Sequence, residues 1–288
     1  ELPKEKFSKK QWQLKQCRRC KECIAENRAV RLGASNEEPL SAGGAVAEEA
    51  PRHTDEDLFK QPPPRKECPI CMLPLPLRGE HIRYQACCGK KLCIGCIDAV
   101  KLGDNQITCP FCRTPALASD GEYIERMKER AGGGDADAIR NLGCHYFHGE
   151  MGLRRNQGKA MRLYLRAGEL GHAQAYCNLG VSYANGEGVR RNEMKAKYYW
   201  ELAAMVGDVD ARYNLGIFEK KSGNMDRAVK HWMIAAGAGH DKSLQQVRRC
   251  FLEGHSTKDR FERALRAHKE ANDDMKSNQR DKAAAARG

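Results

Sequence analysis

The stretch GHAQAYCNLGVSYANGEGV, residues 171–189, decides how most of this chain folds. Ala175 precedes Leu179 by four residues, a spacing that places both side chains on one face of a helix. The glycine that opens the stretch recurs along the chain, each time ahead of a small residue that stands four positions before an apolar one. The opening glycines are Gly134, Gly171, Gly207 and Gly239, at intervals of 37, 36 and 32 residues. This self-similarity predicts a helical repeat.

A second helix is expected in each repeat, because alanine recurs four positions before an aromatic residue. The pairs are Ala160 and Tyr164, Ala196 and Trp200, and Ala228 and Trp232, whereas the last copy has Ala264 before His268. We interpret the aromatic side chains as core rather than as ligand contacts. A two-helix repeat of about 36 residues cannot bury its apolar face alone, so the copies are expected to stack into a solenoid.

The runs Leu179-Gly180-x-x-Tyr183 and Gly186-Glu187-Gly188-Val189 resemble Sel1-like repeats, which are relatives of the tetratricopeptide class. The resemblance covers residues 134–268, with two well-matched copies, a third that has a shortened loop and a poor fourth. It implies an α-helical repeat domain over residues 120–270 that binds a protein substrate or partner.

Cysteine is the second informative feature of the sequence. There are 14 cysteines, and eight of them fall between residues 68 and 112, largely as C-x-x-C pairs. A two-residue gap lets both sulfurs point at one ion in tetrahedral geometry, so the spacing favours zinc over disulfides. The long helical remainder has no paired cysteines, which is typical of a reducing compartment, and we expect a cytoplasmic or nuclear location.

Four cysteine pairs can bind two zinc ions either in sequence or interleaved. The pairs are Cys68 and Cys71, Cys87 and Cys88, Cys93 and Cys96, and Cys109 and Cys112. Residues 67–113, which close with Cys-Pro-Phe-Cys-Arg, resemble a RING finger of the all-cysteine type. The resemblance implies that the first and third pairs share one zinc ion and that the second and fourth pairs share the other. The expected fold is therefore mainly α: a two-zinc finger of short strands plus one helix, followed by a helical-repeat solenoid.

One position departs from the usual RING pattern. Many RING fingers have a Cys-Gly-His run, but Cys88-Gly89-Lys90 places lysine there, and an ammonium group cannot bind zinc. Cys87 is taken as the ligand instead, with His81 as the alternative. A segment of about 46 residues has a marginal core. Structural zinc contributes roughly 10–16 kcal/mol in finger peptides, so we expect the metal to hold this segment folded.

The RING resemblance implies ubiquitin ligase activity, with a ubiquitin-conjugating enzyme and ubiquitin as partners and no covalent intermediate on this chain. Ile70 and Pro110 match positions that contact the conjugating enzyme. Arg113 matches the arginine that hydrogen-bonds ubiquitin and the conjugating enzyme together. Val100 stands where many active members have tryptophan, and it is a weaker anchor. The alternative is a non-catalytic zinc-binding scaffold for protein interactions.

A third zinc site is a hypothesis for the N-terminal residues 1–32. Cys20 and Cys23, with Phe7–Trp12 ahead of them, resemble the second half of a small zinc domain of a heterochromatin adaptor. The other two ligands of that domain would lie before Glu1. A basic helix with three free thiols is the alternative.

Two segments have no helical or strand periodicity that would predict packing. Residues 33–66 contain paired glycines, an acidic patch and three consecutive prolines, which is linker composition. Residues 271–288 are polar and end in an alanine run, and we expect a disordered tail.

Charge and hydropathy argue against two classes of function. The net charge is +12, but the basic surplus is spread along the chain instead of forming a stripe that could follow phosphates. We therefore expect a solvated surface of mixed charge and no nucleic-acid partner. No apolar run approaches the roughly 18–20 residues of a membrane span, so no membrane association is expected.

Overall fold

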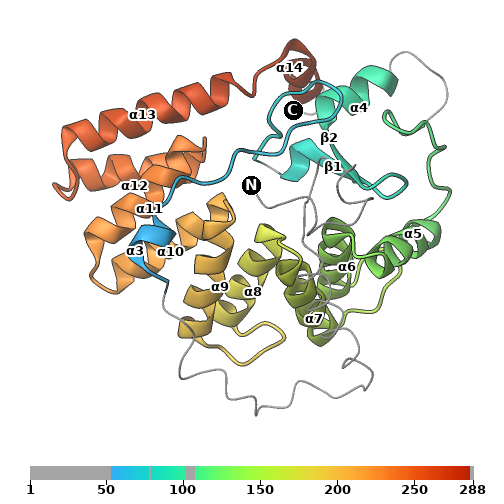
Figure 1. The fold of residues 1–288 in the computed structure, drawn as a ribbon, viewed down its shortest axis with the longest axis horizontal. Helices are drawn as coiled ribbons and strands as arrows, with labels where there is room; N and C mark the ends of the chain where they lie inside the picture. The colour runs from blue at the N-terminus through green and yellow to red at the C-terminus, as the bar shows by residue number, and fades with distance from the viewer. Residues whose placement is uncertain (1–52, 78, 102–107, 286–288) are drawn as a thin grey trace, which may run out of the picture. The chain divides into compact units, whose positions relative to one another are not determined.

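The computed structural model describes residues 53–77, 79–101 and 108–285 (Figure 1). Within these residues the chain is mainly α-helical and has one two-stranded sheet, which confirms the predicted mainly α class and its helical-repeat solenoid. Cys20, Cys23 and the remainder of the hypothetical zinc module at 1–32 lie outside the described residues.

The repeats form a succession of antiparallel helices in which neighbours along the chain pack against one another (Figure 1). The helix pairs α6–α7, α8–α9 and α10–α11 each correspond to one repeat. The helices are α5 (Asp120–Gly132), α6 (Ala136–His148), α7 (Gln157–Glu169), α8 (Ala173–Asn185), α9 (Glu193–Met205), α10 (Val209–Lys221), α11 (Met225–Gly237), α12 (Asp241–Leu252) and α13 (Lys258–Asp273).

Local sequence explains where these helices begin and end. The Asp135 carboxylate accepts hydrogen bonds from backbone N–H groups in the first turn of α6, and the Asp208 carboxylate does so at α10. Both are preferred N-cap residues. Gly149 and Gly186 end α6 and α8 with φ of 77° and 78°, a left-handed conformation that glycine adopts without a steric penalty.

The repeated aromatic residues lie in the core, as predicted, and each one packs directly on a glycine of the preceding helix. Tyr164, Trp200 and Trp232 are at most 8% exposed. A Cβ added to the facing glycine would lie 2.2–2.8 Å from the aromatic ring, for the pairs Gly143 and Tyr164, Gly180 and Trp200, and Gly216 and Trp232. The two helices of a repeat therefore approach so closely that only glycine fits at the contact.

The cysteine-rich segment, residues 67–113, is called the finger below. Its regular elements are η2 (Gly79–His81), the strands β1 (Ile82–Gln85) and β2 (Lys90–Cys93), and α4 (Ile94–Lys101). The strands pair antiparallel, with Ile82 opposite Cys93. The short hairpin carries Cys87 and Cys88 in its turn and leads through Cys93 directly into α4.

Residues 33–66 are predicted to be a linker. The structure describes this segment from residue 53 onward, and there it contains a helix that packs on the repeats. Thr54 caps a short helix, α3 (Asp55–Leu58), and the Leu58 side chain is fully buried against α9 and α10. Leu58 and Phe59 are an apolar pair in an otherwise polar segment. Four residues are too few to show helical periodicity, so composition alone suggested a linker.

The predicted disordered tail also differs from the structure. Residues 278–285 form α14 (Asn278–Ala285), which packs against α4 of the finger (Figure 1). Ala283 is only 6% exposed and belongs to the buried cluster of the finger. Alanine has the highest helix propensity, and the packing of Ala283 on the finger supplies the tertiary contact that a short helix needs.

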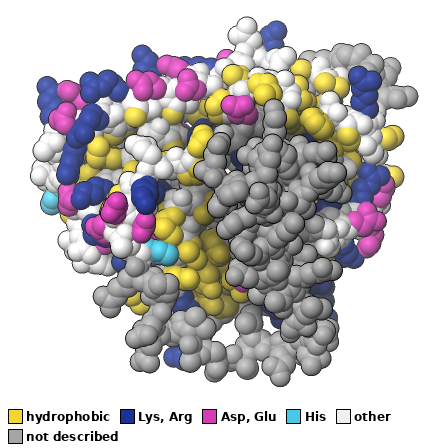
Figure 2. Space-filling view, viewed as in Figure 1, with side chains coloured by type: hydrophobic (Ala, Val, Ile, Leu, Met, Phe, Trp, Pro, Cys, Tyr) yellow, Lys and Arg dark blue, Asp and Glu magenta, His cyan; other side chains and the backbone are white. Residues whose placement is uncertain are grey.

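Two findings bear on the excluded classes of function. None of the helices in the described part of the chain is both long enough and apolar enough to span a bilayer. Towards the left and right sides of the view in Figure 2, lysine and arginine side chains lie among aspartate and glutamate side chains. Pairs such as Arg260 with Asp226 (2.7 Å) and Arg249 with Glu253 (2.8 Å) neutralise basic groups locally.

Candidate metal centre

Two loops of the finger share one backbone design. In the first loop the Cys68 N–H donates to the Leu73 carbonyl (2.9 Å), and the Met72 N–H donates back to the Cys68 carbonyl (2.9 Å). Met72 has a φ of 56°, in the left-handed region. This tight turn directs the sulfurs of Cys68 and Cys71 to the same side.

The second loop repeats the design with different side chains. The Cys109 N–H donates to the Thr114 carbonyl (2.8 Å), the Arg113 N–H donates to the Cys109 carbonyl (2.8 Å), and Arg113 has a φ of 59°. The sequences CPICMLP (68–74) and CPFCRTP (109–115) match at both cysteines and both prolines. This internal match was available in the sequence as a sign that both loops form equivalent ligand turns.

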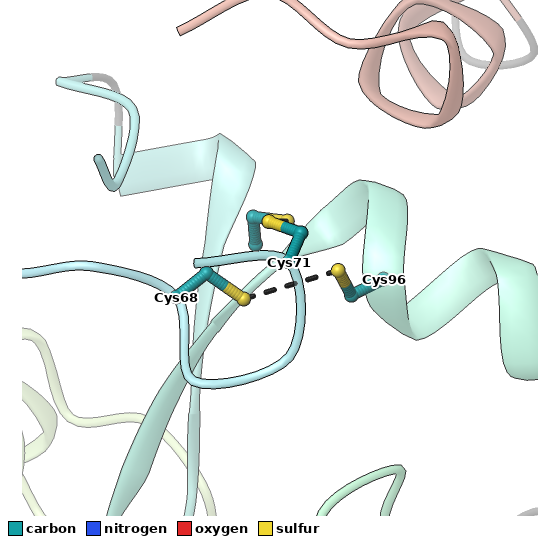
Figure 3. Close-up of side chains that lie close together, drawn as sticks. Cys68, Cys71 and Cys96 are labelled. Carbon is teal, nitrogen blue, oxygen red and sulfur yellow. Dashed lines mark hydrogen bonds between the residues drawn. The ribbon is translucent and has the colours of Figure 1, made fainter. Parts of the chain in front are cut away.

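The first and third cysteine pairs come together in the structure. Cys68, Cys71, Cys93 and Cys96 place their sulfurs within 4.8 Å of one another. The sulfur–sulfur distance is 3.9 Å for Cys68 and Cys96, and also for Cys71 and Cys93. Figure 3 shows the Cys68 side chain from the first loop directed at Cys96 from α4.

The second and fourth pairs form the other group. The sulfurs of Cys87, Cys88, Cys109 and Cys112 also lie within 4.8 Å of one another. The Cys88 and Cys109 sulfurs are 3.9 Å apart, and those of Cys87 and Cys112 are 3.4 Å apart. The alternative ligand His81 belongs to neither group, and its ring lies beside the Glu80 carboxylate instead (3.4 Å).

Both groups fit a tetrahedral zinc ion. Four thiolates at about 2.3 Å from zinc lie roughly 3.8 Å from one another, which is close to the 3.9 Å of three of these pairs and longer than the 3.4 Å between Cys87 and Cys112. The described cysteines are free thiols, so no disulfide competes for these sulfurs. Each group takes two sulfurs from each of two separate segments, so the interleaved pairing would fix those segments together.

The protonation of the metal-free thiols makes metal binding at these groups dependent on pH. Burial, together with neighbouring sulfurs, raises the pKa of Cys87 and Cys96 well above the ordinary thiol value. Desolvation acts on Cys68 as well, but hydrogen bonds from the backbone of Cys71 and other residues outweigh it and lower the pKa of Cys68 to about 7. The metal-free groups therefore retain protons that a cation must displace, so metal affinity is expected to fall as pH falls.

Two arginines from outside the finger support the metal groups, and the sequence analysis missed both. Arg130 of α5 donates to the carbonyls of Ala86 (2.5 Å) and Cys87 (2.8 Å). Arg280 of α14 donates to the Pro74 carbonyl (2.8 Å) and lies 3.4 Å from the Cys71 sulfur. Each arginine holds one ligand loop from an element distant in sequence.

The remaining residues singled out in the sequence lie on or near the surface of the finger. Ile70 is 39% exposed, and Phe111, at the equivalent position of the second loop, is 44% exposed. Arg113 is exposed, whereas Pro110 and Val100 are partly exposed. The backbone thus presents the tips of both ligand loops to solvent, while the first cysteine of each loop, Cys68 or Cys109, is buried.

Comparisons with known proteins concern the repeats. The Sel1 repeat family model matches residues 136–172 and 173–208, which are the two copies predicted from the sequence to match best. Among curated proteins no relative matches the chain.

Several solved structures are similar to the repeats. A Sel1 repeat protein from Oxalobacter formigenes has 25% identity and a TM-score of 0.47, over 56% of this chain and 68% of that one. A protective antigen of uropathogenic Escherichia coli with an SLR fold has 31% identity and a TM-score of 0.45. That match covers 52% of this chain and only 33% of the antigen.

Proposed function

We propose that the chain is a RING-type ubiquitin ligase: its finger binds two zinc ions and docks a ubiquitin-charged conjugating enzyme, and its helical repeats recruit the protein substrate. The observation that carries the proposal is the interleaved grouping of the four cysteine pairs. Sequential pairing would have built two separate zinc knuckles, whereas interleaving produces the arrangement that the RING resemblance implies.

Zinc would act structurally at both groups. Four cysteines complete its coordination, so neither site leaves a position for a water or a substrate, as catalytic zinc sites do. The metal fixes the two loops, and the loops present Ile70, Pro110 and Phe111 to a partner. Transfer of ubiquitin would then rest on orientation of the thioester rather than on a nucleophile of this chain.

Arg113 is the residue we assign to the transfer step. Its guanidinium is exposed beyond the last ligand, so it can hydrogen-bond ubiquitin and the conjugating enzyme together. Arg113 has a φ of 59°, a left-handed conformation that is unfavourable for arginine and for alanine alike. Arg113→Ala therefore removes the guanidinium with little change in the stability of the loop.

A reconstituted reaction tests the proposal. The zinc-loaded full chain is mixed with activating enzyme, a panel of conjugating enzymes, ubiquitin and ATP. We expect ubiquitin chains to form, Ile70→Ala to slow them by roughly 10- to 100-fold through lost apolar burial, and Arg113→Ala to slow them by about tenfold through lost charged hydrogen bonds.

Matched controls separate docking from folding. Arg83→Ala removes another exposed arginine of the finger, and Leu252→Ala removes an aliphatic side chain that is 71% exposed on α12. Both are expected to keep wild-type rates, and all variants should keep two zinc ions. A folded, zinc-loaded chain that stays silent with every conjugating enzyme would refute the ligase.

A zinc-dependent interaction scaffold is the second candidate. It is favoured by Val100, a small and only partly exposed side chain where the family resemblance implies a large aromatic anchor. In that case Val100→Trp would not create activity in the silent chain, whereas a weak ligase would gain rate from it.

A further inference from the structure

The segment before the finger lies on the helical repeats at α9–α11. Residues 54–59, called the docked segment below, comprise the N-cap Thr54, the helix α3 and Phe59. The Leu58 side chain is fully buried in the cluster that contains Trp200 and Leu215. Phe59 lies over the ring of His231 from α11, with 4.7 Å between the ring centroids. Leu58 and its hydrogen-bond partner Arg212 are 154 residues apart in the sequence.

Buried polar side chains lie beneath the docked segment. Arg212 of α10 is 2% exposed, and its guanidinium donates to the backbone carbonyl of Leu58. Burial lowers the pKa of Arg212 to about 10. Its Nε has no hydrogen-bond partner among the described residues. A buried guanidinium aimed at a main-chain carbonyl is a contact that any peptide in this position could make.

His231 is the second buried polar group. Its side chain has no exposed surface, and neither ring nitrogen finds a hydrogen-bond partner in the described part of the chain. Burial, with the nearby charges of Arg212 and Arg227, lowers the pKa of His231 to about 3, so the ring is neutral. The docked segment therefore leaves both nitrogens of the buried His231 ring without a hydrogen-bond partner.

Two basic groups of α11 lie at the rim of the docked segment, and each also pairs with an acidic residue of the repeats, Arg227 with Glu219 and Lys230 with Asp226. Arg227 forms an ion pair with Asp55, and its guanidinium carbon lies 5.4 Å from the centroid of the Phe59 ring. The Lys230 ammonium lies 5.7 Å from the same centroid. Three consecutive acidic residues, 55–57, precede the apolar pair Leu58 and Phe59. Charge and shape thus match an acidic segment that ends in an aliphatic–aromatic pair.

A purely structural role does not explain this surface. Buried polar groups that lack partners cost free energy, and apolar residues would hold Leu58 and Phe59 equally well. Recognition of a peptide main chain, in contrast, needs a donor such as Arg212 in the floor. The docked segment is also short: Leu58 is its one fully buried side chain, while the side chain of Asp55 is 62% exposed.

We propose that α9–α11 form a peptide-binding groove for an acidic segment that ends in a leucine–phenylalanine pair, occupied in cis by residues 54–59 and open to a partner segment of the same chemistry. The covalent linkage gives the cis segment a high effective concentration, so a partner must displace it. This inference rests on the part of the proposed function that assigns partner recruitment to the repeats. It does not depend on whether the finger transfers ubiquitin.

A labelled peptide with the sequence of residues 53–60, HTDEDLFK, tests the groove on the zinc-loaded full chain. We compare the wild type with the double variant Leu58→Ala/Phe59→Ala, which removes both anchors of the docked segment. The peptide should bind the double variant at least about tenfold more tightly, because the competing segment is weakened. Bound peptide should also raise the melting temperature of the double variant towards the wild-type value.

A second variant covers the case in which the double variant does not fold. Asp55→Arg replaces an exposed side chain, creates no cavity and turns the ion pair with Arg227 into a repulsion. It is expected to bind the peptide more tightly than the wild type does, by a smaller factor. Leu252→Ala, exposed on α12, is the matched control and should bind like the wild type.

Altered peptides decide what the groove recognises. A peptide with alanine at the positions of Leu58 and Phe59, and one with lysine at the three acidic positions, should both lose binding to the double variant. The proposal is overturned if the folded double variant and Asp55→Arg bind no peptide, or if the charge-reversed peptide binds as well as the original. The readout is binding alone, so a failure here is distinct from a failure of ubiquitin transfer.

Discussion

Three of the eight residues in the buried cluster of the finger are candidate metal ligands, whereas the buried clusters of the repeats consist mostly of aliphatic and aromatic side chains. Cys68, Cys93 and Cys96 are core residues of the finger, and Ala283 joins them from α14. In the repeats, alanine and glycine admit a large aromatic residue at each helix pair. We therefore expect the finger to depend on a bound metal ion for its stability, while the repeats fill their interior with side chains.

The difference shows in how the two regions use each other. Asp135 and Asp137 of the first repeat contact Tyr84 (2.7 Å) and Lys91 of the finger hairpin. Arg130 and Arg280 approach the finger from either end of the repeats. The finger contributes Ala86 and Tyr84 to the buried cluster of α5–α8, whereas the other two clusters of the repeats contain none of its residues. The finger in turn takes hydrogen bonds and an apolar contact from the helices around it.

Metal removal should separate the two regions most strongly. Structural zinc contributes roughly 10–16 kcal/mol in finger peptides, more than a typical domain's stability of about 5–15 kcal/mol. A chelator is expected to unfold the finger and release α14, because Arg280 and Ala283 lose their partners. Amide hydrogen exchange should show lost protection in residues 67–113 and 278–285, while α6–α12 keep theirs.

Acidification is the control for the chelator. Lowering the pH protonates the thiols and should expel the metal with the same pattern of lost protection. Before treatment, metal analysis should return about two zinc ions for the finger of each chain. Loss of protection throughout α6–α12 at the same chelator concentration would show that finger and repeats unfold as one unit. It would contradict the expectation that only the finger depends on metal.

A glycine substitution should damage the repeats and spare the finger. A Cβ at Gly216 would lie 2.2 Å from the indole nitrogen of Trp232, which donates to the Tyr213 carbonyl (3.2 Å). Because the ring cannot stay in place, Gly216→Ala should lower the free energy of unfolding by about 2–3 kcal/mol. Denaturant titration followed by far-ultraviolet circular dichroism measures this loss, and the zinc content should stay unchanged.

Gly237→Ala is the matched control in the next helix. Its added Cβ would meet its nearest neighbour at 3.5 Å, an ordinary contact, so the higher helix propensity of alanine should leave stability unchanged or slightly raised. Equal effects of the two substitutions would mean that the aromatic–glycine contact does not control the packing of the repeat.

Periodicity and ligand spacing predicted much of both regions. Small residues four positions before apolar ones marked the helix pairs, and alanine before an aromatic residue marked the core positions of Tyr164, Trp200 and Trp232. The cysteine pairs, taken with the RING resemblance, predicted two interleaved groups, and the structure brings those sulfurs together. These features are local, repeated or restricted in chemistry, so they can be recognised without coordinates.

Contacts between distant segments could not be predicted in the same way. Arg280 is 209 residues from Cys71, and Arg212 is 154 residues from Leu58. Nothing in the composition of residues 33–66 or of the alanine-rich tail distinguishes an anchored segment from a free one. Only the packed structure shows that a single leucine and a single arginine find buried partners there.

The smallest expected effect tests whether the finger needs its helical neighbours. Arg280→Ala removes the hydrogen bond to the Pro74 carbonyl and the guanidinium 3.4 Å from the Cys71 sulfur. Loss of such an outer contact typically weakens metal binding by about tenfold or more, so zinc should pass faster to a chromogenic chelator. Arg263→Ala on α13, whose partner is Asp259 (2.9 Å), is the control and should release zinc at the wild-type rate. If Arg280→Ala releases zinc at the control rate, the zinc ion of the group that contains Cys71 is held without help from α14. The finger would then depend on the surrounding helices only through its hairpin and Arg130.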